Sequence, residues 1–383
     1  MRSRLRTRIE TVMTGPAAGP AISFSGLLSV LAAVYGGVTK LRSEAYGHGW
    51  LRRRRLPCRV ISVGNMVLGG TGKTPMTIYL ARQLQAAGIA TAVVSRGYGG
   101  RAERTAGVVS NGRRLLMGSA DAGDEPCMMA RILDGVPVLV GRDRYGTGRI
   151  ALEAFSPEVI ILDDGFQHLR LQRDINLVLL DAATPFDNGC LFPRGTLREP
   201  ISALSRADAV IMTRWPGDIP TTPAMATPTY RNAHRRMPVF HASHTPQFRI
   251  VDPTRASGDG DAVRSPLKTG TPLEVYAFSA IARNSDFVKA LIGAGYRVTG
   301  TRFFPDHHRY TEGEIRGIFE AARGAHAVML ATTEKDFARL RSGVHWPLPL
   351  VVAGVTISFG PQAEAFRRFI ADRLDGDPYT VAP

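Results

Sequence analysis

Cysteine is scarce in this chain, which has only three cysteines in 383 residues. Cys58, Cys127 and Cys190 are odd in number and far apart, so neither a disulfide framework nor a zinc site follows from them. Such sparse use of cysteine is typical of a protein in a reducing compartment. The apolar content of 44% and the charged content of 21% are ordinary for a folded protein, and the length allows two domains.

Acidic residues are few relative to basic ones, and the difference is concentrated near the N-terminus. The sequence has 48 Lys and Arg against 33 Asp and Glu, a net charge of +15 and an isoelectric point near 10.3. Residues 1–55 hold ten of the basic residues but only two acidic ones, Glu10 and Glu44. This excess favours an anionic membrane or nucleic acid as partner. We expect no nucleic acid, because aromatic residues do not alternate with the Arg run at 52–55.

Charged residues are absent between Glu10 and Lys40, where the stretch 22–38 is mostly apolar. As a helix this stretch is about 26 Å long at ~1.5 Å per residue, shorter than the ~30 Å hydrocarbon core of a bilayer. We therefore expect a helix that lies in the membrane interface, held on anionic lipid by Arg52–Arg55, rather than one that spans the membrane. A cleaved signal peptide and a buried first helix are the competing interpretations.

One glycine is missing from an otherwise recognisable phosphate-binding loop. The segment Gly-Gly-Thr-Gly-Lys-Thr at 69–74 follows a predicted strand and precedes a predicted helix, and Val67 stands where the usual motif has its first glycine. In such a loop backbone N–H groups surround the phosphates, Lys73 reaches the outer phosphates and the Thr74 hydroxyl binds Mg²⁺. The predicted ATP site argues against a signal peptide, because ATP is cytoplasmic. Residues predicted to bind ATP are Val67, Leu68, Gly69, Gly70, Thr71, Gly72, Lys73 and Thr74.

Apolar strand-like segments alternate with helix-like segments, which is typical of parallel sheets covered by helices on both faces. Strands are predicted over 60–63, 91–95, 136–140, 159–162, 175–180 and 209–213, with helices over 76–87, 125–133 and 145–155. A second series has predicted strands over 273–278, 297–303, 327–331 and 350–355 and helices over 285–294, 312–322 and 361–373. The predicted division is a membrane-associated segment, a P-loop NTPase-like α/β domain, a linker with two connecting strands, and a smaller α/β domain, at 1–55, 56–225, 226–272 and 273–383.

Two adjacent carboxylates, Asp163 and Asp164, end the predicted strand that begins near Glu158. An acidic residue at such a strand end helps to hold the metal opposite a phosphate loop. Neighbouring residues of an extended chain point to opposite sides, so we expect the two carboxylates to have different roles. With a phosphate loop upstream, we favour a metal site over a turn or a helix cap.

Other polar residues lie where strands end or helices begin. Asp124 precedes a predicted helix, and the sequence explains it equally well as a helix cap. Arg144 follows a predicted strand, where it could contact phosphate. The run Asp306-His307-His308 lacks the partners of a zinc site, so a His that works with a carboxylate in proton transfer is the better interpretation. Glu334 and Lys335 could meet the purine base or the ribose.

In their order and spacing these blocks together resemble the tetraacyldisaccharide 4'-kinase family of the lipid A pathway of Gram-negative bacteria. The resemblance covers roughly residues 20–370. It is carried by the phosphate loop and by the following segments: Gly64-Asn65, Ser95 to Gly99, Gly123 to Pro126, Asp143 to Tyr145, Leu162 to His168, Leu180-Asp181, Pro185-Phe186, Gly195 to Pro200, Phe304 to His307 and Thr332 to Asp336. The missing glycine at Val67 is part of this family's pattern.

The resemblance implies transfer of the γ-phosphoryl group of ATP to the 4'-hydroxyl of a tetraacylated glucosamine disaccharide 1-phosphate, with Mg²⁺ as cofactor. It implies that Asp124 is the general base, paired with His307, and that Arg144 stabilises the transferred group. The implied metal residues are Thr74, Asp163, Asp164 and Glu199, and the implied residues for the lipid substrate are Arg96, His168 and Arg198. It also implies work at the cytoplasmic face of the inner membrane, on a lipid A disaccharide precursor and with no obligate protein partner.

Two alternatives come from other classes of protein. A membrane-recruited P-loop ATPase switch usually carries Lys just before the paired glycines, whereas this chain has Leu68 there. A non-catalytic lipid-binding module does not explain the phosphate loop and the paired Asp residues.

Overall fold

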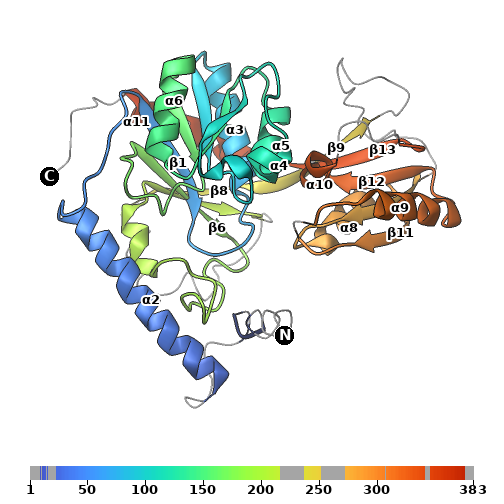
Figure 1. Cartoon of the computed structure of the whole chain (residues 1–383), viewed down its shortest axis with the longest axis horizontal. Helices are drawn as coiled ribbons and strands as arrows, with labels where there is room; N and C mark the ends of the chain where they lie inside the picture. Colours follow the sequence, from blue (N-terminus) through green and yellow to red (C-terminus); the bar gives the residue numbers. More distant parts are fainter. Residues whose placement is uncertain are drawn as a thin grey trace.

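The computed structural model describes residues 9, 11–13, 15, 23–215, 237–251, 272–306, 308–340 and 346–375. Two sheets with their helices form two α/β units, and a long helix projects from the first unit (Figure 1). The predicted fold class is confirmed: a P-loop-like parallel sheet, a second smaller sheet and an N-terminal apolar helix are all present.

Eight strands form the first sheet in the order β3-β4-β2-β5-β1-β6-β7-β8. All neighbours pair in parallel except β3, which lies antiparallel to β4 at the edge. The strands are β1 Arg59–Asn65, β2 Thr91–Ser95, β3 Gly107–Ser110, β4 Val138–Val140, β5 Val159–Asp163, β6 Ile175–Asp181, β7 Ala209–Thr213 and β8 Val239–His241. The edge strand β3 was not predicted, because four residues are too few to give a periodic pattern.

Alternate residues of the central strands face two different sets of helices. Ile61 and Val63 of β1 belong to the core that includes residues of α3 (Lys73–Ala86), α5 (Asp124–Ile132) and α11 (Ala363–Asp375). Val60 belongs to the opposite core, which includes residues of α6 (Arg144–Phe155). Since both faces are covered, the strands read as continuous apolar runs, and ligands are expected beyond their carboxyl ends.

Five strands form the second sheet in the order β11-β10-β12-β13-β9. They are β9 Ser243–Val251, β10 Glu274–Ser279, β11 Arg297–Phe303, β12 Met329–Thr333 and β13 Leu350–Ser358, with helices α8 Asn284–Gly293, α9 Glu312–Gly324 and α10 Glu334–Arg339. Thr311 begins α9 with a reciprocal capping box, in which Glu314 bonds back to the Thr311 backbone.

Within the described residues, the chain passes between the two units at two places. Strands β8 and β9 follow each other directly, but β8 pairs with β7 of the first sheet and β9 pairs antiparallel with β13 of the second. At the other crossing, α11 follows the second sheet and packs its Phe366 and Ile370 into the core of the first unit. The segment predicted as a linker therefore supplies a strand to each sheet. The last helix, predicted within the second domain, covers the first sheet because its apolar face packs there.

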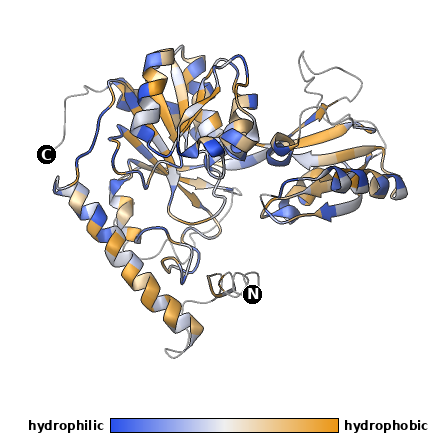
Figure 2. Ribbon diagram, viewed as in Figure 1, coloured by the Kyte–Doolittle hydropathy of each residue, from blue (hydrophilic) through white to orange (hydrophobic). Residues whose placement is uncertain are grey.

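The N-terminal helix α2 spans Phe24–Gly47, and its 24 residues make it about 36 Å long. It is longer than the apolar stretch from which we predicted it, because the helix continues through the polar turn after Val38. Figure 2 shows that apolar residues are concentrated in the N-terminal half of this helix. By length and composition alone this helix could cross a membrane. The Pro-rich stretch predicted at 216–228 lies outside the described residues.

Candidate active site

The phosphate loop lies between β1 and α3 and has the backbone shape that glycine allows. Gly69 and Gly72 have positive φ angles of 117° and 90°, and Gly72 is the residue before the first turn of α3. Because Gly72 has no side chain to cap that turn, the N–H groups at the start of the helix remain open toward the loop. A helix N-terminus of this kind binds phosphate oxygens through its N–H groups and its dipole.

Val67, the residue in place of the missing glycine, is an anchor for the loop. Its side chain is buried in a cluster with Phe166 and Leu197. The Asn65 side-chain amide donates to the Val67 carbonyl at 2.7 Å, and the Leu68 N–H donates to the Thr196 carbonyl at 2.7 Å. The Val67 side chain thus faces the core, and only its backbone is available to a phosphate.

Gly72 has no room for a side chain, which leads to a prediction. A Cβ built there would lie 2.5 Å from Nε2 of His244, and its φ is in the left-handed region. We expect Gly72→Ala to lower the free energy of unfolding by at least about 1–2 kcal/mol and to weaken ATP binding. Gly70→Ala is the matched control, because a Cβ at Gly70 meets nothing within 4 Å. Equal unfolding midpoints in urea for the two variants would contradict this explanation.

Asp163 and Asp164 have different surroundings, as the alternation of the strand predicts. Asp163 is buried and accepts hydrogen bonds from the hydroxyls of Ser95 at 3.0 Å and Thr77 at 3.2 Å. Burial, together with the nearby charges of Glu125 and Asp164, raises the pKa of Asp163 to about 6. This carboxylate is therefore destabilised in its ionised form until a cation approaches.

Asp164 is in the left-handed region, with φ at 53°, and its carboxylate faces positive charge. Arg198 binds both of its oxygens, at 2.6 and 2.9 Å, and Nζ of Lys73 lies 3.8 Å away. Burial opposes ionisation, but Lys73 and Arg198 outweigh it and lower the pKa of Asp164. Asp164 thus links the lysine of the loop to Arg198.

The donor set near the loop suits Mg²⁺. Among the described residues no group of three or more His, Cys, Asp or Glu side chains could hold a metal ion. Magnesium sites in phosphoryl-transfer enzymes do not need such a group, because they use one or two carboxylates with a hydroxyl, waters and substrate phosphates. Thr74, Asp163 and Asp164 offer only oxygen atoms, which are the ligands that Mg²⁺ prefers.

Glu199 lies next to Arg198 in the chain, but its carboxylate has a basic partner. It is buried and forms an ion pair with Arg206, whose guanidinium lies 4.7 Å from the centre of the Phe166 ring. The carbonyl of the neighbouring residue Arg198 accepts a hydrogen bond from the Tyr35 hydroxyl of α2 at 2.9 Å. The N-terminal helix is therefore in direct contact with the segment that holds Asp164.

Asp124 is the first residue of α5, and Gly123 rather than Asp124 is its N-cap. The helix-cap interpretation is therefore wrong. The backbone at Gly123 lies close against the turn after β2. A Cβ added to Gly123 would lie only 2.9 Å from the carbonyl oxygen of Tyr98 in that turn. The turn after β2 follows Ser95, which bonds Asp163. Asp124 and the paired carboxylates thus lie at the same edge of the first sheet.

The second unit meets this edge through α10. Nε of Arg339 lies 2.8 Å from the Asp124 carboxylate, and the Arg339 side chain is only 1% exposed. Arg339 also pairs with Asp336 at 3.0 Å and lies 3.8 Å from Asp306. The position of Asp306 brings the segment around residue 306 close to Asp124, whereas His307 itself lies outside the described residues.

Arg339 was not found from the sequence. It is 215 positions from Asp124 and belongs to no recognisable motif, so only the packing of α10 on α5 reveals it. The neighbouring residues predicted to meet the nucleotide are in ion pairs: Glu334 with Arg249 at 2.8 Å, and Lys335 with Glu125 at 3.4 Å. Their role in nucleotide binding stays a prediction.

Arg144 is buried and His168 is half-buried, and each has a buried nitrogen without a partner among the described residues. Arg144 is the first residue of α6 and donates to the Gly141 carbonyl at 2.8 Å through Nη1, which leaves Nε unsatisfied. Burial, first, and then the charge of Arg144 lower the pKa of His168 to about 4, so its ring is neutral at pH 7. Buried groups without partners are uncommon and suit a polar ligand. Arg96, by contrast, pairs with Glu103 at 2.7 Å.

Comparison with known proteins agrees with this geometry. The sequence model of the tetraacyldisaccharide-1-P 4'-kinase family matches residues 24–375. A tetraacyldisaccharide 4'-kinase of Desulfatibacillum aliphaticivorans is 41% identical over 97% of this chain and 99% of its own length, and one of Geobacter sulfurreducens is 41% identical over 88% and 90%. The crystal structure of LpxK from Aquifex aeolicus in complex with ATP aligns with a TM-score of 0.71 and 29% identity, covering 92% of this chain and 100% of that one.

The family match spans the phosphate loop, the paired carboxylates, Asp124 and α10, which are the elements that meet at the site. The membrane-recruited ATPase switch is therefore not favoured. The chain belongs to the tetraacyldisaccharide-1-P 4'-kinase family.

Proposed function

We propose that this chain transfers the γ-phosphoryl group of ATP to the 4'-hydroxyl of tetraacyldisaccharide 1-phosphate and so forms lipid IVA. The observation that carries the proposal is the meeting of three parts at one edge of the first sheet. They are an open phosphate loop, the carboxylates at the end of β5, and Asp124, which contacts Arg339 of α10 in the second unit. Phosphoryl transfer depends mainly on positioning and on stabilisation of charge, and these parts supply both.

On the donor side, the loop N–H groups and Lys73 would hold the phosphates of ATP. Arg144 would offer its unsatisfied Nε to the transferred phosphoryl group, whose charge is spread over its outer oxygens. Mg²⁺, when bound by Thr74, Asp163 and Asp164, would neutralise charge on the phosphates. Arg198 would keep Asp164 ionised and oriented for this role, because it binds both oxygens of that carboxylate. Glu199 would contribute its charge near the metal.

On the acceptor side, Asp124 would take the proton of the sugar hydroxyl. Its pairing with Arg339 fixes the orientation of the carboxylate, which a base requires before it can accept a proton. His307 would work with Asp124. Closure of the second unit, which carries Arg339, would exclude water and limit hydrolysis of ATP.

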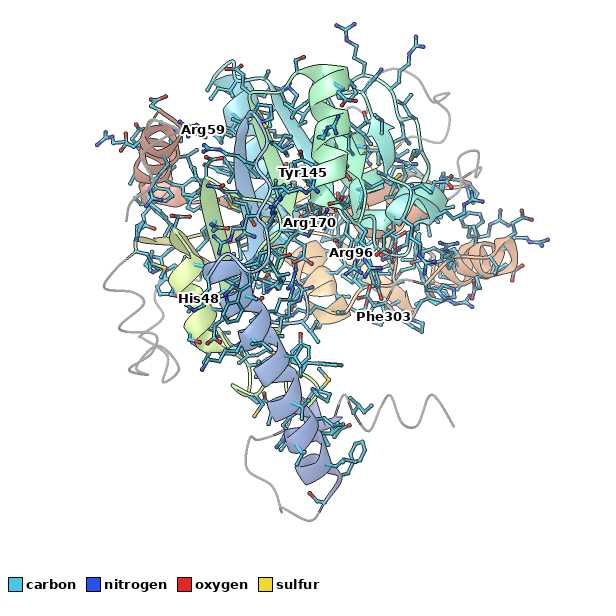
Figure 3. The ribbon with its side chains drawn as sticks, turned by 60° about the vertical axis from the view of Figure 1, so that its left-hand side comes forward. His48, Arg59, Arg96, Tyr145, Arg170 and Phe303 are labelled. Atoms are coloured by element: carbon cyan, nitrogen blue, oxygen red, sulfur yellow. The ribbon has the colours of Figure 1, made fainter. Side chains whose placement is uncertain are left out.

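The disaccharide and its phosphate would bind beside the loop, toward α2. Arg96, His168 and Arg198 are the proposed contacts. In Figure 3, Arg96 and Arg170 lie near Tyr145 of α6, on the side of that helix toward α2. His168 has a neutral ring with an unsatisfied Nε2, which could donate to or accept from a sugar hydroxyl.

The outer face of α2 supports an attachment to the cytoplasmic face of the inner membrane. Its exposed apolar side chains are Leu27, Val30, Leu31, Val34, Val38 and Leu41. Few of the residues of this helix are buried against the protein, and the Arg run at 52–55 follows it. An apolar stripe followed by basic side chains is typical of a helix that binds an anionic lipid surface. The acylated substrate would then reach the site along α2, whose Tyr35 contacts Arg198.

Charge on this stripe is expected to release the protein from membranes. Val30 and Val34 are each 62% exposed, so Val30→Glu with Val34→Glu should leave the fold intact while it opposes burial in lipid. We expect the variant to move from the membrane pellet to the supernatant and to keep its activity on detergent-dispersed substrate. Val30→Leu with Val34→Leu is the apolar control. Co-sedimentation of the Glu variant with membranes would contradict this attachment.

Phosphate release with and without the lipid separates this proposal from an ATPase switch. A kinase of this design should release little phosphate from ATP alone, because the acceptor hydroxyl is absent. Addition of the disaccharide lipid should consume ATP without an equal release of free phosphate. Rapid release of phosphate that does not depend on lipid would instead support the switch.

A further inference from the structure

Two carbonyl groups of the phosphate loop are bound from outside the loop, by residues at the end of β7. The Thr213 hydroxyl donates to the Thr71 carbonyl at 2.8 Å, and Thr213 is fully buried. Nη2 of Arg214 donates to the Gly70 carbonyl at 2.6 Å. Neither residue belongs to the loop or to the paired carboxylates, so the active site as described above gives them no role.

Peptide geometry gives these two bonds a consequence for the ligand. In a trans peptide the C=O and the following N–H point in opposite directions. Binding of the Gly70 and Thr71 carbonyls therefore turns the N–H groups of Thr71 and Gly72 away from Thr213 and Arg214, toward the other side of the loop. Successive N–H groups that converge in this way form a site for a phosphate. The loop is thus held in its anion-binding shape before any phosphate arrives.

Arg214 itself is held by a carboxylate that both units share. Asp181, at the end of β6, has a side chain that is only 6% exposed and lies 2.5 Å from Nη1 of Arg214. Nη2 of Arg283, just before α8 of the second unit, lies 3.1 Å from the same Asp181 oxygen. Arg283 also lies 3.9 Å from Asp286, so two guanidinium groups meet two carboxylates, and the role of this cluster is to hold Arg214 in place beside the loop.

The backbone of Arg214 indicates that its direction matters. Its φ of 54° is in the left-handed region, which costs a residue with a Cβ about 1 kcal/mol or more. In this conformation the Arg214 side chain reaches the Gly70 carbonyl of the loop. Strained residues of this kind persist where the surrounding contacts require them.

We propose that Thr213 and Arg214 are positioning residues that hold the phosphate loop in its phosphate-binding shape, and that Asp181 and Arg283 couple this shape to the position of the second unit. The inference rests on the proposed function, because it takes the loop as the place where the phosphates of ATP bind. These residues touch the loop and not the reacting atoms. They should therefore affect the binding of ATP more than the rate of transfer at saturation.

The first test uses two matched pairs of variants. Thr213→Val removes the hydroxyl at nearly constant volume, whereas Thr213→Ser keeps it. Arg214→Asn removes the guanidinium but tolerates the left-handed backbone, and Arg214→Lys keeps the charge without the fork that reaches both Gly70 and Asp181. We expect R214N to raise the KM for ATP and the Kd for ADP about tenfold, the effect of one charge-assisted hydrogen bond. T213V removes a hydrogen bond between neutral groups and should raise both about threefold to tenfold, and kcat of each variant should stay within about threefold of wild type. T213S should match wild type, and R214K should lie between.

The second test addresses the coupling between units. Arg283→Ala should weaken ATP binding less than R214N does. In the double variant the two effects should not add, because both act through Asp181. Additive effects would overturn the coupling to the second unit.

Lys73→Met separates failure of this inference from failure of the proposed function. If K73M weakens ATP binding while R214N and T213V bind ADP as wild type does, the positioning role is overturned and the loop keeps its ligand. If K73M also binds normally, the phosphates do not lie in this loop and both proposals fail. A fall in the melting temperature of R214N with an unchanged Kd for ADP would indicate a merely structural role and would also overturn the inference.

Discussion

Asp124→Asn is expected to lower the rate of phosphoryl transfer by about a hundredfold to ten-thousandfold, the contribution typical of a positioned general base. Asparagine has the same shape and keeps an oxygen for the hydrogen bond from Arg339, but it cannot accept the proton of the sugar hydroxyl. ATP binding should change little, because Asp124 is the first residue of α5 and does not belong to the phosphate loop. The measurement is kcat with the lipid acceptor, with the Kd for ADP determined in parallel.

Asp121→Asn is the matched control for this variant. Asp121 lies three residues earlier and forms an exposed ion pair with Arg101 at 2.7 Å. Its loss should leave transfer unchanged, since exposed ion pairs of this kind contribute little. Near-normal turnover by Asp124→Asn would remove Asp124 from the role of base.

Lys73→Met is expected to lower transfer by about a hundredfold to a thousandfold and to weaken the binding of ATP as well. Lys73 is mostly buried and faces Asp164 at 3.8 Å, so its ammonium group is directed toward the metal edge of the site. Methionine keeps the length and apolar stem of the side chain and removes its charge. The loss should be accompanied by a higher pKa of Asp164, because the charge of Lys73 helps to lower that pKa.

Lys289→Met serves as the control for a lost lysine charge, because Lys289 is exposed on α8. Both variants should melt near the wild-type temperature. Kinetic constants of Lys73→Met within a few fold of the control would contradict a phosphate-binding role for the loop.

Local patterns in the sequence were sufficient for the parts of the fold and site that local chemistry determines. The alternation of apolar runs predicted β1, β2, β5, β6 and β7, since a strand buried on both faces must be apolar throughout. The phosphate loop was recognisable despite Val67, because the positions that need positive φ, Gly69 and Gly72, are glycines. The adjacent Asp163 and Asp164 were predicted to differ in role, and their partners do differ.

Contacts between distant segments were beyond local patterns. Nothing near Arg339 in the sequence indicates that it meets Asp124, and nothing near Asp181 indicates that it joins Arg214 to Arg283. The packing of α11 on the first sheet was missed for the same reason, because an amphipathic helix does not reveal which core it covers. The length of α2 was underestimated because a helix can continue through polar residues where its outer face is exposed.

The most direct test of the central claim follows the γ-phosphoryl group from ATP to the lipid. Wild-type protein is incubated with γ-³²P-ATP, Mg²⁺ and the tetraacylated disaccharide 1-phosphate, in parallel with an analogue that lacks the 4'-hydroxyl. We predict that label enters the natural lipid and that none enters the 4'-deoxy analogue. Label on the analogue, or label recovered only as inorganic phosphate with the natural lipid, would contradict the account.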